Sequence, residues 1–390
     1  MRTNRGIDDD TFAQLLDTVT RFTRERLMPA EETVEETDEI PETLVQEMRD
    51  LGLFGLSIPV EYGGIGLDMR QEVRVIEALC YASLAFRSLI GTTVGIGSQG
   101  IVMHGTEEQK RNYLPRLATG ELIASFALTE PDVGSDAAHI RTSARRNGID
   151  FVVSGTKRYI TNATRCGMYT LLARTDQDVD GAGGITAFLM PADTPGIVLG
   201  KPDRKMGQRG TRTCDVVLND VRLLESMIIG GPERINKGFA TAMQVLDRGR
   251  IHLSAVATGT AQRMVDVATA YAVERKQFGV PIGHHQLVQG LLADSQTELM
   301  AMRALARSAA ATFDAEGKAP LEASCSKYFS SEAAGRIADR AVQVHGGAGY
   351  MAEYPVERLY RDVRLLRIYE GTSQIQQMII GRTMVRNAAA

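Results

Sequence analysis

The stretch IYEGTSQIQ (residues 368–376) places one carboxylate, Glu370, before a glycine, two hydroxyl residues and a glutamine. Gly371 lets the backbone turn or approach a ligand closely, and serine or threonine commonly opens a helix. The apolar residues that follow have helical spacing. The pattern predicts a carboxylate at the start of a helix, where it could interact favourably with the helix dipole or act as a general base.

Hydroxyl and glycine residues gather in FALTEPDVGSD (residues 126–136). Gly134 allows backbone amides to come close to a ligand, and Thr129 and Ser135 add hydroxyl groups. Such a combination can hold a phosphate or the polar edge of a ring. The same residues would equally suit an acidic turn that caps the next element, so this stretch alone leaves both interpretations open.

The strand candidate KRYITN (residues 157–162) contributes an aromatic ring and a hydroxyl. Because side chains alternate along a strand, Tyr159 and Thr161 are predicted to share one face. That face would suit a flat heteroaromatic ring whose nitrogen accepts a hydrogen bond from the hydroxyl. A tyrosine packed on a sheet is the commoner reason for such a residue.

Two stretches in the C-terminal half combine polar side chains with the ends of predicted helices: ERKQFG (residues 274–279) and QVHGGAGY (residues 343–350). Arg275 could bind a phosphate through two N–H groups or complement a helix C-terminus. The glycines after Gln343 suit a nucleotide or a sharp helix–helix connection. HHQ (residues 284–286) is not expected to bind a metal, because adjacent residues of a helix point to different faces.

Length and composition set the broad class. The chain has 390 residues, 44% apolar residues and a formal net charge of −4, so two or three packed units are expected, with neither nucleic acid nor a membrane as partner. The four cysteines show no C-x-x-C spacing, which favours a reducing compartment. Since the N-terminus has no apolar signal region and no stretch has the length of a membrane span, we expect a cytoplasmic protein.

The candidate residues must be positioned by three successive parts of the chain. Residues 8–117 have helical periodicity, residues 123–223 consist of short β-branched runs separated by turns, and the chain after Pro232 is again helical. This order differs from the alternation of a doubly wound fold. GIGSQG (residues 95–100) matches the dinucleotide fingerprint, but the preceding residues look helical, so we interpret its glycines as part of a helix–loop connection.

Together these stretches occur in the order in which the acyl-CoA dehydrogenase family carries its motifs, and the chain resembles that family over nearly its whole length. It contains both family signatures, T-E-P-x-x-G-S-D and Q-x-x-G-G-x-G-Y. The resemblance implies an α+β multidomain fold. Residues 1–122 would form an N-terminal helical domain, residues 123–231 a middle β domain, and residues 232–390 a C-terminal four-helix bundle.

The resemblance also implies FAD, bound between the β domain and the C-terminal helices, with its tail reaching a neighbouring subunit. Thr129 would hold the pyrimidine edge of the flavin, Thr161 would donate toward N5, and Tyr159 would cover the ring where many relatives have tryptophan. The full set of implied FAD contacts is Phe126, Leu128, Thr129, Gly134, Ser135, Tyr159, Ile160, Thr161, Arg275, Gln277, Phe278, His285, Gln286, Gln343, Gly346, Gly347, Thr372 and Gln374. Within this set, the residues from Arg275 to Gln286 would contact the FAD of the partner subunit.

In the family, Glu370 matches the catalytic base, which removes the α-proton of an acyl-CoA while the β-hydride leaves to the flavin, giving a trans-2-enoyl-CoA. Some relatives take their base from the long helix, where this chain has Gly249, so Glu370 has no rival. Ser135, Asp247, Arg250 and Gly371 would contact the substrate. The resemblance further implies acyl-CoA metabolism such as fatty acid β-oxidation, an electron-transferring flavoprotein as acceptor, and a homotetramer. An oxygen-using flavoprotein and a relative that no longer dehydrogenates are alternatives.

Arg87 departs from the pattern of straight-chain enzymes. Alignment of the N-terminal helices puts residues 86–91 at the far end of the acyl pocket, and Arg87-Ser88 resembles the pair with which glutaryl-CoA dehydrogenases receive a second carboxylate. Against this, Cys80 stands where those enzymes carry an acid, and Arg87 could turn outward to pair with Glu77. A plain or branched acyl-CoA is therefore the first expectation, and a dicarboxylyl-CoA the alternative.

Overall fold

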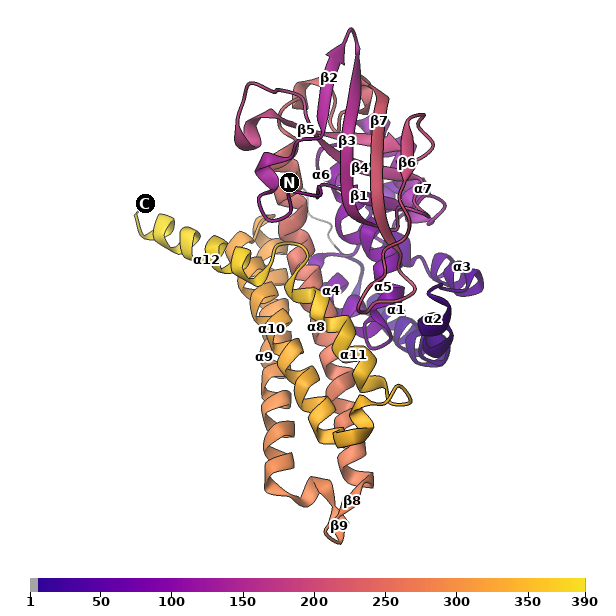
Figure 1. The fold of residues 1–390 in the computed structure, drawn as a ribbon, viewed down its shortest axis with the longest axis vertical. Coiled ribbons are helices and arrows are strands. Elements are labelled where there is room, and N and C mark those ends of the chain that lie inside the picture. Colours follow the sequence, from indigo (N-terminus) through magenta and orange to yellow (C-terminus); the bar gives the residue numbers. More distant parts are fainter. Residues whose placement is uncertain (1–5, 390) are drawn as a thin grey trace.

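The computed structural model describes residues 6–389 and divides into helices, a sheet and helices again (Figure 1). The first part consists of short helices connected by tight turns. They are α1 (Asp9–Phe22), α2 (Glu31–Thr37), α3 (Glu42–Asp50), α4 (Met69–Leu79), α5 (Leu84–Gly91), α6 (Gln99–His104) and α7 (Glu107–Ala118). Of these, α4 and α5 turn most of their residues inward, because they lie between the other N-terminal helices and the C-terminal part.

The second part is a twisted sheet. Its strands are β1 (Ala124–Ala127), β2 (Ser143–Asn147), β3 (Asp150–Thr161), β4 (Met168–Arg174), β5 (Ile185–Pro191), β6 (Ile197–Leu199) and β7 (Thr213–Leu224). They pair in the order β1-β4-β2-β3-β7-β6, with β5 on the other edge of β4. The two longest strands, β3 and β7, form an antiparallel pair. Hydrophobic runs such as those of β4 and β5 are buried along their length, as their lack of alternation indicates.

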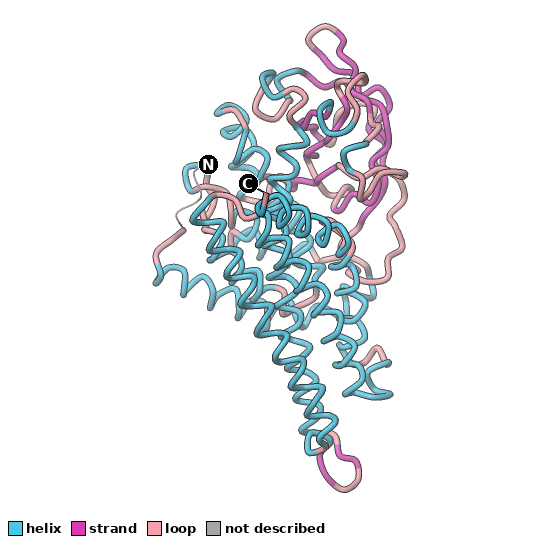
Figure 2. Tube along the Cα trace, turned by 90° about the vertical axis from the view of Figure 1, so that its left-hand side faces the viewer, coloured by secondary structure: helices cyan, strands magenta, loops and turns pink. Residues whose placement is uncertain are grey.

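The third part is a bundle of long helices: α8 (Gly238–Glu274), α9 (Gln286–Glu316), α10 (Pro320–His345), α11 (Pro355–Val363) and α12 (Ser373–Ala388). Between α8 and α9, the short strands β8 (Lys276–Gln277) and β9 (Val280–Pro281) form a hairpin at the tip of the bundle. Figure 2 shows how far the helices carry this tip from the strands. Because α8 packs against α4, α9 and α10, most of its residues are buried, and it can present side chains to the interior at several levels.

The predicted order is confirmed: helices lie within residues 9–118, strands within residues 124–224, and helices again after Pro232. GIGSQG follows α5 and continues in helical turns, so the dinucleotide fingerprint has no strand before it. Within residues 6–389, no helix is long and apolar enough to cross a membrane. We propose domain boundaries after residues 122 and 231, since both fall between a helix and a strand.

Candidate active site

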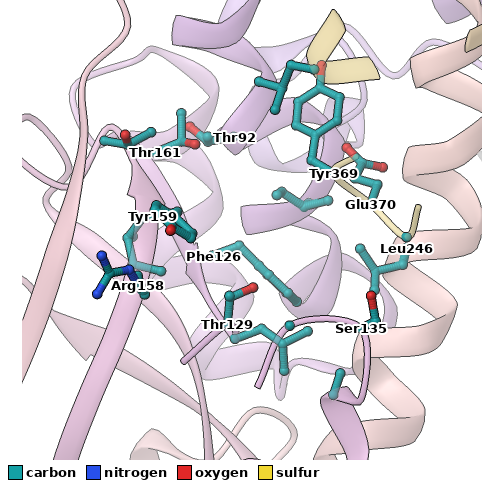
Figure 3. Close-up of a pocket in the computed structure, with 18 of the residues that line it drawn as sticks. Thr92, Phe126, Thr129, Ser135, Arg158, Tyr159, Thr161, Leu246, Tyr369 and Glu370 are labelled. Carbon is teal, nitrogen blue, oxygen red and sulfur yellow. The ribbon is translucent and has the colours of Figure 1, made fainter. Parts of the chain in front are cut away.

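A cavity of about 370 Å³ lies between the sheet and the C-terminal helices, and α5 contributes to its wall. Figure 3 shows Tyr159 and Thr161 on one side of it and Leu246 and Glu370 on the other. The structure brings many of the predicted site residues to this cavity. They are Arg87, Ser88, Phe126, Leu128, Thr129, Gly134, Ser135, Tyr159, Ile160, Thr161, Arg250, Glu370 and Gly371.

Glu370 enters the cavity from the turn before α12. Its φ of +53° and the φ of +88° at Gly371 are left-handed, a conformation that costs a non-glycine residue energy and needs support from its surroundings. The helix itself is capped by Thr372, whose side chain accepts a hydrogen bond from the backbone N–H of Ile375. Because Thr372 satisfies the helix end, the capping role that the sequence left open for Glu370 is already filled.

Three donors hold the carbonyl groups of this turn. Lys327 of α10 donates from Nζ to the Gly371 oxygen at 2.6 Å. Gln376 donates to the carbonyl oxygens of both Glu370 and Gly371, at 3.1 Å each. Arg250 donates from Nε to the Glu370 oxygen at 3.4 Å. Because these hydrogen bonds hold the carbonyl groups, the strained turn is fixed and the Glu370 carboxylate stays in the cavity.

Gly249 of α8 makes room for that carboxylate. A Cβ atom built on Gly249 would lie 2.5 Å from Glu370 Oε2, closer than two non-bonded atoms can approach. Oε2 is buried and has no hydrogen-bond partner among the described residues. A buried, unpartnered carboxylate oxygen is costly, and a carboxylate that faces an open cavity is available to take a proton.

Charge and burial act against each other on Glu370. Burial raises the pKa of Glu370 above its usual range, and three cations oppose this rise, Arg87 more than Lys327 and Arg250. A carboxylate with a raised pKa is a stronger base than one in water, and the three cations limit how far the pKa rises. Burial also lowers the pKa of Lys327 to about 8.

Lys327 was not predicted from the sequence. It is only 1% exposed and lies on a helix face made of alanine and serine. A lysine surrounded by small residues at helical spacing was the available signal, but it is a weak one, since many lysines of amphipathic helices reach solvent along such faces.

The opposite wall is built by the loop after β1, which is fastened to β3. The backbone N–H of Arg158 donates to the Thr129 oxygen at 2.8 Å. The buried ammonium of Lys157 donates to the Leu128 oxygen at 3.0 Å and to Glu130 at 2.8 Å. These bonds fasten the loop that carries Thr129 to the strand that carries Tyr159.

The simple strand alternation predicted for Tyr159 and Thr161 is wrong. The register of β3 against β7 shifts between Lys157 and Ile160, and Tyr159 has a φ of +58°. This irregularity turns four successive residues, 158–161, toward the cavity. Tyr159 and Thr161 therefore both line it, but because of a bulge and not because of the period of a strand.

The β wall fits a flat polar ligand. The hydroxyls of Thr129, Ser135 and Thr161 line the cavity and make no hydrogen bond within residues 6–389, so they are free to donate or accept. A Cβ atom built on Gly134 would meet nothing within 4 Å, which leaves the backbone of this loop open to the cavity. Tyr159 remains 58% exposed and adds an aromatic surface. These groups match what an isoalloxazine ring of FAD requires.

Arg87 points inward. It is 5% exposed and lines the cavity, whereas Glu77 pairs with Arg303 at 2.6 Å. The outward pairing of Arg87 with Glu77 is therefore wrong. The neighbouring Ser88 donates its hydroxyl proton to Gln208 at 3.1 Å, so in this structure the hydroxyl proton of Ser88 is already committed.

Asp247, Thr372 and Gln374 do not line the cavity. Asp247 accepts a hydrogen bond from Arg250 at 2.6 Å and so positions that arginine. Thr372 and Gln374 lie at the start of α12, where the backbone N–H groups of a helix favour an anion.

The remaining predicted residues lie at the tip of the bundle. They are Arg275, Gln277, Phe278, His285, Gln286, Gln343, Gly346 and Gly347. The two segments that carry them meet there, since Tyr271 stacks on His345 with ring centroids 4.3 Å apart. Along α8 the tip is about 37 Å from Gly249, at 1.5 Å per residue. Phe278 is 94% exposed. Within one chain the structure therefore does not bring these residues to the cavity.

The chain matches three sequence models of one family, in order along its length. They are the N-terminal domain of acyl-CoA dehydrogenases at residues 9–121, the middle domain at residues 125–221 and the C-terminal domain at residues 236–385.

Similar proteins have related activities. A 3-(aryl)acrylate reductase of Clostridium sporogenes (strain ATCC 15579) is 41% identical over 365 residues, 94% of this chain and 96% of the relative. A caffeyl-CoA reductase–Etf complex subunit of Acetobacterium woodii is 38% identical over 353 residues, 90% of this chain and 92% of the relative. The crystal structure of an acyl-CoA dehydrogenase complexed with FAD from Bacillus anthracis superposes with a TM-score of 0.90 at 34% identity, covering 98% of this chain and 67% of that one.

Proposed function

We propose, since this chain belongs to the acyl-CoA dehydrogenase family, that Glu370 is the base of an acyl-CoA α,β-dehydrogenation. The protein is an FAD-dependent oxidoreductase that acts on acyl-CoA. The observation that carries the finer proposal is the Glu370 carboxylate, which lines the cavity beside Gly249 and whose Oε2 is buried without a hydrogen-bond partner among the described residues.

In the forward reaction, Glu370 takes the proton from Cα of the thioester, and a hydride leaves Cβ as the double bond forms. Bound FAD supplies the acceptor for that hydride. The α-proton is weakly acidic, so the base must be positioned and poorly solvated. Burial supplies the second condition, and the bonds from Lys327 and Gln376 to the turn supply the first.

The negative charge that develops on the thioester oxygen needs donors. The backbone N–H of Glu370 is the candidate donor within this chain, because it belongs to the turn that Lys327 and Gln376 hold in place. The flavin would be held by Phe126, Leu128, Thr129, Gly134, Ser135, Tyr159, Ile160 and Thr161. Tyr159 would cover the ring, and the hydroxyl of Thr161 would donate to it.

The direction of the reaction follows from the redox partner and not from the base. Two relatives carry the word reductase in their names, and the same carboxylate, once protonated, can return its proton to Cα of a 2-enoyl-CoA. We expect an electron-transferring flavoprotein to exchange electrons with this enzyme, as the name of the Acetobacterium relative suggests for that protein. We place the activity in acyl-CoA metabolism such as fatty acid β-oxidation in the cytoplasm.

In a homotetramer built as a dimer of dimers, the tip of the bundle would reach the FAD of a second subunit. Arg275, Gln277 and Phe278, with His285 and Gln286, would contact the FAD of a second subunit. Gln343 and Gly347 would bind its adenine half. Thr372 and Gln374 would meet the pyrophosphate at the start of α12. The support is that Arg275, Gln277 and Phe278 are exposed at the tip, about 37 Å along α8 from Gly249.

A second candidate function is dehydrogenation of an acyl-CoA that ends in a carboxylate. It is favoured by Arg87, a buried guanidinium on the cavity wall with no acidic partner within 4 Å among the described residues. A buried cation is stable only with a partner, and a substrate carboxylate would supply one. Arg87 and Glu370 line the same cavity, and among the cations Arg87 acts most strongly against the raised pKa of Glu370.

The base assignment is tested by mixing flavin-loaded protein anaerobically with acyl-CoA in a stopped-flow instrument. Glu370→Gln should keep its flavin and its affinity for acyl-CoA, but reduce the flavin about 10²- to 10⁴-fold more slowly, the range expected for a general base. Reduction by Glu370→Gln at the wild-type rate would reject the assignment. Reoxidation of the reduced protein in air, as rapid as turnover, would instead favour an oxidase.

The second function is tested with two acyl-CoAs of equal length, valeryl-CoA and glutaryl-CoA, which differ in a terminal methyl or carboxylate. Wild type should prefer glutaryl-CoA, and Arg87→Met should lose roughly 10- to 100-fold of that preference, the value of a charge-assisted hydrogen-bonded pair. Loss of the Arg87 charge also raises the pKa of Glu370, but this acts on both substrates and cancels in the ratio. An unchanged ratio would leave plain acyl-CoA as the substrate.

A further inference from the structure

A chain of buried polar side chains from three helices stands behind Arg87. Arg87 of α5 donates from Nε to His252 Nε2 of α8 at 2.9 Å. His252 Nδ1 lies 2.6 Å from Glu72 Oε1 of α4, and the other oxygen of Glu72 pairs with Arg248 of α8. None of these four side chains is more than 6% exposed, and only Arg87 lines the cavity.

The bonding pattern fixes the state of His252. Since the Nε–H of Arg87 is a donor, His252 Nε2 must be an unprotonated acceptor, and the ring proton must sit on Nδ1, from which it is donated to Glu72. Burial lowers the pKa of His252 to about 4, with the charge of Arg87 acting in the same direction. Around neutral pH the histidine is therefore uncharged and oriented by Glu72.

The carboxylate of Glu72 does not neutralise Arg87. It is paired directly with Arg248, and the neutral imidazole ring separates it from the guanidinium. Although burial opposes ionisation, the charge of Arg248 and the hydrogen bond from His252 hold the pKa of Glu72 below its usual range. Arg87 thus receives a hydrogen-bond acceptor for its Nε but no opposite charge.

The floor under Arg87 is also built to fit it. A Cβ atom built on Gly91 would lie 2.9 Å from both Cζ and Nε of Arg87 and 3.2 Å from Nη1. Only a residue without a side chain lets the guanidinium lie against α5 in this way. Nε is engaged by His252, and within residues 6–389 the two Nη groups make no hydrogen bond, so they remain for a ligand in the cavity.

We propose that His252 is a positioning residue that selects the end group of the acyl chain, by holding Arg87 over Gly91 with both Nη groups available to a substrate carboxylate. This inference rests on the second candidate function above. A guanidinium recognises a carboxylate best through two parallel N–H groups, and that geometry requires the ring plane to be fixed. A neutral acceptor fixes the plane of the guanidinium and leaves the positive charge of Arg87 unneutralised. A glutamate in place of His252 would neutralise that charge.

Two other uses of this network predict different behaviour. If the four residues only join α4, α5 and α8, changes at His252 lower stability but treat all acyl chains alike. If Arg87 serves only to keep Glu370 ionised, its loss slows valeryl-CoA and glutaryl-CoA equally. Only the positioning role predicts that changing His252 alters the preference for glutaryl-CoA over valeryl-CoA, so this preference distinguishes it from the two other uses.

The test uses flavin-loaded protein, anaerobic flavin reduction, and the valeryl-CoA and glutaryl-CoA pair. Four variants are compared with wild type: His252→Leu, which removes the acceptor; His252→Gln, whose side-chain oxygen can still accept from Arg87; Arg87→Met; and the double variant with both His252→Leu and Arg87→Met. His104→Leu is the matched control, because His104 also bonds to α8, at 2.6 Å from Gln244, and does not line the cavity. Flavin content and melting temperature are recorded for each protein.

His252→Leu should lower the preference for glutaryl-CoA roughly tenfold or more, through the half-saturating concentration of glutaryl-CoA and not its limiting rate. His252→Gln should recover most of the preference, the double variant should resemble Arg87→Met, and His104→Leu should resemble wild type. If the preference is lost in Arg87→Met but kept in His252→Leu, the positioning role of His252 is rejected, while the second candidate function stands. Additive losses in the double variant would reject the positioning role too. No preference in wild type would reject the carboxylate-ended substrate and this inference with it, leaving the role of Glu370 untouched.

Discussion

Glu370 and Arg87 both enter the cavity beside a glycine, Gly249 in one case and Gly91 in the other, yet their surroundings differ. Around Glu370 the turn is strained and three cations influence its charge. Around Arg87 the helix is regular, and the nearest polar partner is an uncharged histidine. The Glu370 end of the cavity is arranged so that a carboxylate can gain and lose a proton. The Arg87 end is arranged so that a permanent cation stays in one orientation.

The difference shows what each glycine does. Beside Glu370, an added methyl group would press on the reacting oxygen itself. Beside Arg87, it would press on a long flexible side chain that can shift a few tenths of an ångström. The two ends should therefore respond unequally to the same change from glycine to alanine, and that inequality can be measured.

Gly249→Ala should have the largest effect. The new Cβ would lie 2.5 Å from Glu370 Oε2, so the carboxylate must move, and a displacement of about 1 Å in a catalytic group can cost about 10²-fold in rate. Alanine favours a helix by about 1 kcal/mol over glycine, so stability should not fall with activity. Stopped-flow reduction together with a melting curve separates the two. A rate within threefold of wild type would show that Glu370 does not depend on this space.

Lys327→Met should have an intermediate effect that depends on pH. Lys327 opposes the raised pKa of Glu370, so removing its positive charge should raise that pKa further. The base must be ionised to act, so the acid limb of the rate of flavin reduction should move to higher pH, and the rate below the limb should fall. The measurement is a pH profile from 5 to 9. Lys327→Arg keeps the charge and is the control; an unmoved limb in Lys327→Met would exclude an electrostatic role.

Gly91→Ala should have the smallest effect, and this effect should be limited to recognition of the end group of the acyl chain. Tilting the guanidinium would weaken one of its two N–H contacts, lowering the preference for glutaryl-CoA over valeryl-CoA roughly three- to tenfold, while valeryl-CoA is reduced at nearly the wild-type rate. The measurement compares the rates of flavin reduction by glutaryl-CoA and by valeryl-CoA in Gly91→Ala with the same two rates in Gly249→Ala. If Gly91→Ala slows both substrates as Gly249→Ala does, the two ends do not have separate tasks.

The parts of the site that could be predicted from the sequence are those carried by local pattern. The run IYEGTSQIQ predicted a carboxylate before a helix, and α12 does begin at Ser373 with Thr372 as its cap. The alternation in KRYITN gave the right residues for the wrong reason, because a bulge in β3 depends on how β7 pairs with it. Bulges of this kind are set by the partner strand, which a single segment of sequence does not reveal.

His252 and Lys327 could not have been predicted from local pattern at all. Each is one polar residue in an otherwise ordinary helix, and each becomes functional through neighbours more than 40 positions away in the chain, Glu72 and Arg87 for His252, and Gly371 for Lys327. The orientation of Arg87 was open for the same reason. Glu77 is an available partner for Arg87 in the sequence, but in the structure it pairs with Arg303.

The most direct test of the central claim is an anaerobic titration of the flavin-loaded wild-type protein with acyl-CoAs from short to long, plain, branched and carboxylate-ended, with the 2-enoyl-CoA product measured at each step. If the protein dehydrogenates acyl-CoA, at least one subset should bleach the visible flavin band and yield one 2-enoyl-CoA per flavin reduced. A fully loaded flavin that no acyl-CoA bleaches, and that no 2-enoyl-CoA reoxidises after reduction, would contradict it.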